Sequence, residues 1–335
     1  MVICLVVIGC SVSSTEEEFR IRFFSGMCDA SAAVWITNQI FAVANDEDNV
    51  LRLYSLSQNS APLRSINLSS FLHIIPKHPE ADLEGAAREG DWIYWIGSHG
   101  RNKEGKFRPN RHRFFLTRIE WDEPIPTLRP VGIPRTDLLQ WIQRIPALRS
   151  FRLENGRAPK QGGVNVEGLA ADGKGGVWIG FRSPLREGRA LVVHLLNARA
   201  YLLSQQTAPR FGAVDWLDLG GLGIRSLVRI GKGRYLILAG PVGGEGRFAV
   251  YLWDGQGERP IRGTWWIPER LEVHPESLLW VGRSEKGGQG RYVFWVVSDD
   301  GTRRINDRIC KELSDPRQRR FRLIQVEAEF PLRVR

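Results

Sequence analysis

The stretch ADLEGAAREGDWIYWIGSHGR, residues 81–101, contains residue types that often carry chemistry: Glu84, and Ser98 followed directly by His99. A serine and a histidine form a nucleophile–base pair only when their side chains meet. Neighbouring residues of a strand point to opposite faces of the sheet, so Ser98 and His99 do not have that geometry. The sequence therefore favours a repeated structural unit here over a self-contained catalytic motif.

The stretch around Glu84 returns four more times in altered form. Each copy has a polar residue, a small residue and an apolar run, then a Gly- or Asn-containing turn and an aromatic-rich strand. The other copies begin CDASAAVWITNQIFAVANDEDN, VNVEGLAADGKGGVWIGFRS, LGIRSLVRIGKGRYLILAGP and HPESLLWVGRSEKGGQGRYVFWVVSDD. The equivalent polar residues are Ser31, Glu84, Glu167, Arg225 and Glu276.

These five polar residues have a chemical meaning if they converge on one axis. Buried carboxylates need partners, so Arg225 is expected to pair with one or more of the three glutamates. Oxygen ligands on a shared axis suit Ca²⁺ or Mg²⁺, which makes Glu84, Glu167 and Glu276 candidate metal ligands. The alternative is a ring of hydrogen bonds that only joins the repeats.

A second set of polar residues follows the aromatic-rich strands, where Asp46, His99 and Arg182 stand. The segment HGRNKEGKFRPNRHRF, residues 99–114, adds several cations to this end. Guanidinium groups around one cleft favour carboxylate or phosphate ligands, and the alternative is a solvated basic loop. The turn NDEDN, residues 45–49, lacks the spacing of an EF-hand, so a hairpin turn is favoured over a calcium loop.

The repeat has the size and strand content of a propeller blade, about fifty residues with four short strands. In the second copy we expect strands at 83–87, 92–98, 113–121 and 127–133, and in the fourth at 224–230, 234–240, 248–253 and 261–267.

The sequence predicts an all-β, five-bladed propeller. The fifth copy has only three clear strands, so residues 18–25 are predicted to supply the outer strand of the last blade. The long interval between Glu84 and Glu167 contains RTDLLQWIQRIPALRSF, which predicts an inserted helix over 135–149 with Thr136 as N-cap. A sixth, degenerate blade is the alternative.

Cys28 follows the closing strand and Cys310 lies in the blade that this strand completes, so a disulfide that fixes the ring is one hypothesis. Two unpaired buried thiols are the other.

Residues 1–17 are predicted to be an export signal and tether, with residues 18–335 forming one propeller domain. The apolar run over residues 2–8 is too short to span a bilayer, and Val-Ile-Gly-Cys stands at its end. This ending resembles the lipobox of bacterial lipoproteins, in which Cys10 would be lipidated. An apolar N-terminal strand is the alternative, because no Lys or Arg precedes the run. The signal predicts the cell envelope or periplasm, and its absence would predict the cytoplasm.

The composition is that of a globular protein, with 42% hydrophobic and 25% charged residues. The net charge of +10 comes mostly from arginines spread along the chain. No basic helix or nucleic-acid module accompanies it, so no nucleic-acid partner is expected. We expect a monomer that contacts membranes only through a lipid anchor.

The quoted motifs, with DLEGAA, NVEGLA and LGIRSL foremost, resemble a bacterial family of uncharacterised propellers, domain of unknown function family 3616. The resemblance covers essentially everything after residue 25 and implies a propeller. Such proteins look like distant relatives of phytase-like and other exported propellers that share an Asp/Asn-x-Glu-Gly opening. Ser31 and Arg225 depart from that opening, which argues against a ring made only of carboxylates. Because one fold hosts many functions, the resemblance implies no activity.

Three functions remain open. The first is an envelope module that binds an anionic small molecule or glycan in a central funnel. The second is a metal-dependent phosphoester hydrolase, with His99 as general acid and Arg101 and Arg182 orienting phosphate. The third is a protein-interaction scaffold. The expected funnel residues are Asp46, Glu84, His99, Arg101, Glu167, Arg182, Arg225 and Glu276.

Overall fold

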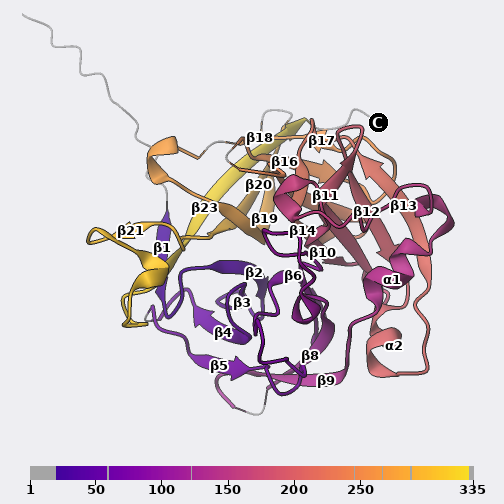
Figure 1. Cartoon of the computed structure of the whole chain (residues 1–335). Coiled ribbons are helices and arrows are strands. Elements are labelled where there is room, and N and C mark those ends of the chain that lie inside the picture. Colours follow the sequence, from indigo (N-terminus) through magenta and orange to yellow (C-terminus); the bar gives the residue numbers. More distant parts are fainter. Residues whose placement is uncertain are drawn as a thin grey trace, which may run out of the picture.

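Five antiparallel sheets stand around a central channel in the computed structural model, which describes residues 20–331 except 59, 122, 245, 266, 287 and 288 (Figure 1). Each sheet is one blade of a β-propeller, so the prediction of five blades is confirmed, and the described residues form no sixth blade. From the channel outwards, the strands of the first two blades are β2 (Ala30–Trp35), β3 (Ile40–Asn45), β4 (Val50–Ser55) and β5 (Arg64–Asn67), then β6 (Leu83–Glu89), β7 (Trp92–Gly97), β8 (Phe114–Glu120) and β9 (Thr127–Arg135).

The third and fourth blades repeat this order. Their strands are β10 (Asn165–Ala171), β11 (Val177–Arg186), β12 (Arg189–Leu195) and β13 (Phe211–Leu217), then β14 (Gly223–Gly231), β15 (Arg234–Gly240), β16 (Ala249–Trp253) and β17 (Ile261–Arg262).

The last blade joins the two ends of the described chain. Its strands, again from the channel outwards, are β19 (Pro275–Lys286), β20 (Gln289–Ser298), β23 (Arg320–Pro331) and β1 (Ile21–Ser25). Strand β1 pairs antiparallel with β23, with Ile21 opposite Ile324 (Figure 1). The predicted closure is therefore confirmed. A disulfide between Cys28 and Cys310, with a Cα–Cα distance of 6.0 Å, lies beside this seam.

The outer strand expected at 261–267 is divided between two blades. Strand β17 pairs with β16, but β18 (Thr264–Trp265) pairs with β23 of the last blade. Gly263 stands at the crossing, where a Cβ atom would lie 2.6 Å from the ring of Phe330. The absence of a side chain lets the two sheets approach each other.

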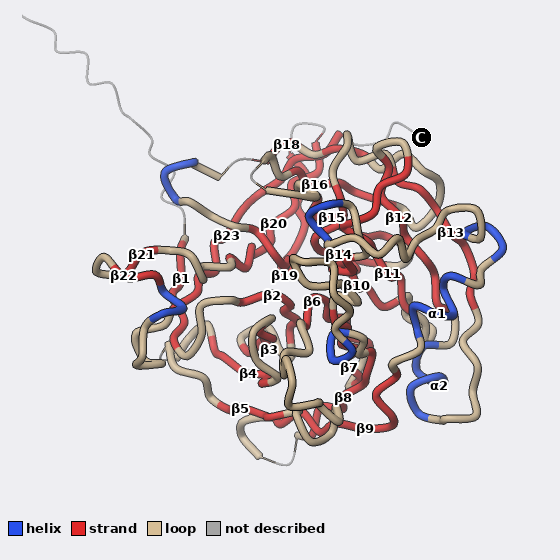
Figure 2. Tube along the Cα trace, viewed as in Figure 1, coloured by secondary structure: helices blue, strands red, loops and turns tan. Residues whose placement is uncertain are grey.

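The inserted helix is shorter than predicted, and a second helix was not foreseen. Asp137 rather than Thr136 is the N-cap residue of helix α1 (Leu138–Gln143), and its carboxylate pairs with Arg135 of β9. Helix α2 (Ala198–Leu203) follows β12, and both helices lie at the outer edge of the ring (Figure 2). Tyr201 of α2 donates a hydrogen bond to Asp137. The remaining short elements are β21 (Arg304–Ile305), β22 (Arg308–Ile309), η1 (Pro109–Arg111), η2 (Pro146–Leu148), η3 (Pro159–Gln161), η4 (Glu269–Leu271) and η5 (Cys310–Glu312).

The hydrophobic core consists of five clusters, each of which fills the space between two neighbouring blades. The strands are therefore covered on both faces, which explains their nearly continuous apolar sequences. Among the described residues, no helix has the length and hydrophobicity that a bilayer span requires.

Every inner strand carries an irregularity at the same place. The register between each inner strand and its neighbour shifts near the start of the strand, as in a β-bulge. A bulge turns a side chain away from the regular alternation of the sheet. The residues that lie at the five shifts are Ser31 with Ala32, Glu84, Glu167, Arg225 and Glu276. The repeated polar position is thus the position of a repeated bulge.

Candidate functional site

The five bulge residues line one cavity of about 280 Å³ at the start of the channel. We call it the acidic pocket, because six carboxylate side chains and three cations surround it. The repeated polar residues of the five blades therefore do meet in one place in the folded protein. The charged residues of the acidic pocket are Asp29, Asp46, Glu84, Glu167, Glu276, Asp299, Lys160, Arg182 and Arg225.

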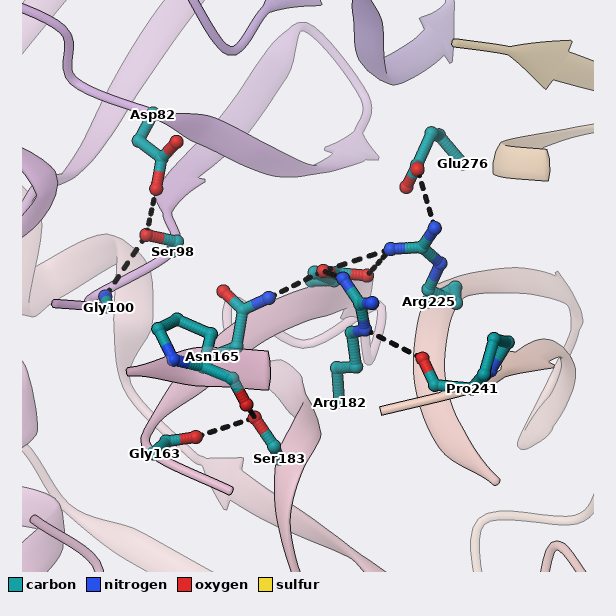
Figure 3. Close-up of polar contacts among 12 residues, drawn as sticks. Asp82, Ser98, Gly100, Gly163, Asn165, Arg182, Ser183, Arg225, Pro241 and Glu276 are labelled. Atoms are coloured by element: carbon teal, nitrogen blue, oxygen red, sulfur yellow. Dashed lines mark hydrogen bonds and ion pairs between the residues drawn. The ribbon is translucent and has the colours of Figure 1, made fainter. Parts of the chain in front are cut away.

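The two arginines of the pocket are already held by glutamates. Arg225 contacts Glu167 through Nη1, at 3.2 and 3.1 Å, and its Nη2 donates to Glu276 Oε1 at 2.6 Å. Arg182 Nη1 donates to Glu167 Oε1 at 2.9 Å, and Asn165 donates to the same oxygen at 2.6 Å. Figure 3 shows Asn165, Arg182 and Arg225 converging from three directions. Glu167 and Glu276 are thus neutralised by protein cations and are poor metal ligands.

Asp46 and Glu84 of the acidic pocket have no such partners among the described residues, and Asp82 of the adjoining cavity lies beside them. One oxygen each from Asp46, Asp82 and Glu84 lie within 4.8 Å of one another. Asp82 is held by Arg111 at 3.1 Å and accepts a hydrogen bond from Ser98. Asp46 Oδ1 is buried and has no hydrogen-bond partner among the described residues. No ion pair within the described residues reaches Glu84. The three oxygens therefore form an under-coordinated group.

Burial raises the pKa of both Asp46 and Glu84 well above the usual value for a carboxyl group. Neighbouring negative charges add to this effect, chiefly Asp82 beside Asp46 and Glu167 beside Glu84. Burial and the charge of Asp299 also raise the pKa of Asp29 to about 7. Full ionisation of these groups would create more negative charge than the described residues compensate, so the groups keep their protons to a higher pH than ordinary carboxyl groups do.

Local structure explains how these three carboxylates meet. Asp46 follows β3 in the hairpin turn that leads to β4, and Glu84 is the bulge residue of β6. Asp82 precedes β6 with φ of 53°, a left-handed conformation that is uncommon outside glycine. The turn 45–49 is the favoured hairpin: Asn45 accepts the N–H of Glu47, and Asp48 binds Arg52.

A wider basin of about 810 Å³ adjoins the acidic pocket and shares Glu84, Lys160 and Arg182 with it. Seven cations and four carboxylates line the basin, so its charge is opposite to that of the pocket beneath it. The cations are Arg101, Lys103, Arg108, Arg111, Lys160, Arg182 and Lys311. We call this region the basic lip.

Two of the predicted funnel residues, His99 and Arg101, are less available to a ligand than expected. His99 lines neither cavity: it is 2% exposed, bonds Gly97 through Nδ1 and packs against His112. Burial lowers its pKa to about 4, so it is neutral and hidden from a ligand. Its backbone has a left-handed conformation, with φ of 55°. Arg101 does reach the lip, but its Nε atom pairs with Glu154 at 2.9 Å.

Asp82, Asp29 and Lys160 line the two cavities but are not among the predicted funnel residues. Asp82 stands two residues before Glu84, the bulge residue of β6, so both residues lie at the channel entrance. This spacing is the signal by which the sequence could have identified Asp82. Lys160 lies in η3, within the insertion that precedes the third blade. An insertion has no counterpart in the other copies, so the repeat gave no signal for it. Cys10 lies outside the described residues.

Fold and site together define a β-propeller whose central channel ends in a polar funnel, an acidic pocket beneath a basic lip. The family model described as "Protein of unknown function (DUF3616)" matches residues 29–120 and 135–274, and the chain belongs to this family. No curated protein matches the chain significantly.

Several solved structures are similar to this chain at low identity and low TM-score. A GH43_1 enzyme from Xanthomonas citri has 12% identity and a TM-score of 0.43, with 91% of this chain and 88% of that one covered. A putative oxidoreductase (glucose dehydrogenase) from Thermus thermophilus has 12% identity and a TM-score of 0.39, with 92% and 99% covered. YCF48 bound to D1 peptide has 10% identity and a TM-score of 0.33, with 84% of this chain covered, and the chain spans 64% of its length. At these values the likeness carries no argument about function.

Proposed function

We propose that this propeller binds a divalent cation in its acidic pocket and, through that cation and the basic lip, an anionic small molecule or glycan. The observation that carries the proposal is the meeting of Asp46, Asp82 and Glu84, whose oxygens lie within 4.8 Å of one another. Among the described residues only Asp82 of the three has a cation paired with it.

The donor set fits a hard cation. Ca²⁺ and Mg²⁺ prefer oxygen ligands and take six or more, so three carboxylates leave positions for water or for oxygens of a ligand. A divalent ion would also compensate the negative charge that raises the pKa of Asp46 and Glu84. Binding would displace protons from these groups, so the affinity for the ion should increase with pH. Glu84 stays among the metal candidates, while Glu167 and Glu276 act as partners of Arg225.

The positive charges of the basic lip favour an anionic ligand. Lys160 and Arg182 line both the acidic pocket and the lip, so they stand where an anion coordinated to the ion would meet the protein. Lys103 is 91% exposed, and its paired carboxylate is 3.8 Å away at Glu104. Cations of this kind raise the local concentration of an anion and favour carboxylate or phosphate.

The test is calorimetric titration of the metal-free protein with Ca²⁺ and with Mg²⁺, followed by titration of the loaded protein with inorganic phosphate and glucuronate. We expect Asp46→Asn and Glu84→Gln to weaken metal binding at least about tenfold, since each removes a ligand. Glu269→Gln, at an exposed residue that lines neither cavity, is the control. If the wild type shows no saturable binding of either metal, the proposal is refuted.

We also propose a cell-envelope location. A disulfide such as Cys28–Cys310 is typical of oxidising compartments, and it supports the same location as the predicted signal in residues 1–17. Fractionation of cells that express the full chain tests this, with recovery in the cytoplasmic fraction as the contrary result.

A phosphoester hydrolase is the second candidate, although without His99 as its acid. Asp29 lines the acidic pocket, and its pKa of about 7 lets it keep a proton near neutral pH. A protonated carboxyl group beside a metal-bound ester is suited to protonate the leaving group. Turnover of p-nitrophenyl phosphate in the presence of Ca²⁺ or Mg²⁺, lost in Asp29→Asn, would favour the hydrolase over a binding protein.

A further inference from the structure

The same five inner strands line a second cavity of about 300 Å³, which we call the far pocket. The acidic pocket is lined by the first residues of these strands, and the far pocket by residues further along each of them. On β10, for example, Glu167 faces the acidic pocket while Leu169, Ala170 and Ala171 line the far pocket. No described residue lines both cavities, so they are separate sites at opposite ends of the channel.

Apolar and aromatic side chains form most of the far pocket. Alanines and leucines of the inner strands form its walls, with Ala86, Leu227 and Leu278 among them. Two half-buried tryptophans stand on neighbouring blades, Trp35 on β2 and Trp280 on β19. The indole N–H of Trp35 donates to the carbonyl of Trp280 at 2.8 Å, which fixes the Trp35 ring. A cavity of this size and lining is at the small end of the range for small-molecule sites.

Two arginines are the only charged side chains among the described residues that line the far pocket. Arg88 of β6 donates to three carbonyl oxygens, those of Trp35, Ile36 and Gly90. Arg229 of β14 donates through Nε to the carbonyl of Gly231 at 3.1 Å. No carboxylate of a described residue is within ion-pair distance of either guanidinium.

This arrangement differs from that of the other channel arginines. Arg182 and Arg225 are both paired with glutamates, whereas the partners of Arg88 and Arg229 in the described part of the chain are neutral. Burial lowers the pKa of Arg88, an effect that Asp91 offsets in part from a distance. A cation that is partly desolvated and lacks a counter-ion attracts an anion more strongly than a solvated one does.

We propose that the far pocket binds an aromatic carboxylate, with its ring between Trp35 and Trp280 and its carboxylate on Arg88 and Arg229. The apolar walls and the two indole rings suit a flat ring system, because aromatic pairs gain energy beyond the burial of their surface. The two guanidinium groups suit a carboxylate, to which arginine can donate two parallel hydrogen bonds. This site is independent of the metal site in the acidic pocket.

The probe is naphthalene-2-carboxylate, and naphthalene-2-carboxamide is its neutral twin of nearly the same shape. We expect the wild type to bind the acid at least about tenfold more tightly than the amide by calorimetry, because a hydrogen bond to a charged group is worth more than a neutral one. Arg229→Gln should reduce this preference at least about tenfold, and Ala86→Phe should abolish binding of both compounds by filling the pocket.

Two controls make the result specific. Arg118→Gln removes an exposed arginine elsewhere on the second blade and should leave binding unchanged. Asp46→Asn alters the acidic pocket, so it should weaken metal binding without changing the affinity for naphthalene-2-carboxylate. If Arg229→Gln fails to fold, Arg229→Lys takes its place. This variant keeps the positive charge and should retain part of the preference for the acid over the amide. Equal binding of acid and amide, no binding of the acid at millimolar concentration, or full affinity in a folded Ala86→Phe variant would overturn the proposal.

Discussion

Arg225 of β14 and Glu276 of β19 form an ion pair across two neighbouring blades, with 2.6 Å between Nη2 and Oε1. The same guanidinium holds Glu167 of β10 at 3.1 Å, so one side chain joins three blades at the channel. Arg225 is 9% exposed and Glu167 is 1% exposed. The pair therefore lies in a region where water screens charge poorly.

Replacing Arg225 with Met should destabilise the protein by about 3–5 kcal/mol, because Glu276 would remain buried without a cation. Glu167 keeps Arg182 in this variant, so most of the loss comes from Glu276. Urea unfolding measures the change. Arg189→Met is the matched control, since Arg189 and Glu258 are 40% and 50% exposed and such pairs contribute less than about 1 kcal/mol. An equal loss in the two variants would contradict the buried pairing.

Stability should fall as the pH rises through about 7 to 8 when no divalent cation is present, because burial raises the pKa of Asp29 to about 7 and that of Glu276 to about 8. Asp46 and Glu84 have raised pKa values, so the folded state still binds protons that the unfolded state has released, and unfolding becomes easier as pH rises. Each unit of difference in pKa corresponds to about 1.4 kcal/mol. Thermal unfolding in EDTA measures the slope.

The same experiment has two internal checks. Glu84→Gln should flatten the slope, and excess Ca²⁺ should do the same in the wild type. Below pH 6.5 the buried His99 and His112 act in the opposite direction, because burial lowers their pKa values to about 4 and about 3. Their contribution is lost as the pH falls, so only the higher range tests the carboxylates. Stability that rises from about pH 7 to 8 in EDTA would contradict this account.

Removing the disulfide with Cys28→Ala and Cys310→Ala should cost roughly 3–5 kcal/mol, because the bond closes a very long loop of the unfolded chain. Guanidinium unfolding of the wild type with and without reductant should give the same difference. Reductant should have no effect on the double variant. A wild type that is insensitive to reductant would show that the two sulfur atoms are not joined.

Gly263→Ala should destabilise the protein by about 1–3 kcal/mol, because the new Cβ would collide with the buried ring of Phe330. Phe330→Leu makes room, so the double variant should be more stable than the sum of the two single changes predicts. Gly231→Ala is the control, since no described atom lies within 4 Å of a Cβ there. Additive losses in a double-mutant cycle would show that the crossing between the blades is not tight.

The strands were predictable because each blade repeats a local pattern. The expected strand 83–87 corresponds to β6, Leu83–Glu89, and the expected strand 234–240 to β15 with the same bounds. The convergence of the repeated polar residues was also predictable, since equivalent positions of a propeller surround one axis. The sequence repeat was therefore sufficient to predict both the fold and the residues that converge in the acidic pocket.

Other features depend on contacts that no local pattern encodes. His99 is buried against His112 and has a left-handed backbone, and neither feature is encoded in the residues next to it. The bulge at Glu84 depends on how β6 pairs with β7, and the neutralisation of Glu167 depends on Arg182 and Arg225 from two different strands. Side-chain partners across strands decide which carboxylates remain available to a ligand.

The position of β1 also affects how the protein is made. Because Ile21 pairs with Ile324, β1 is translated long before its partner strand, and it has no ladder to join for roughly 15–60 s at ordinary rates of synthesis. The residues of the first four blades are synthesised while this early strand and Cys28 still await their partners. Ring closure therefore waits for the synthesis of β23, and until then the chain must keep one strand free.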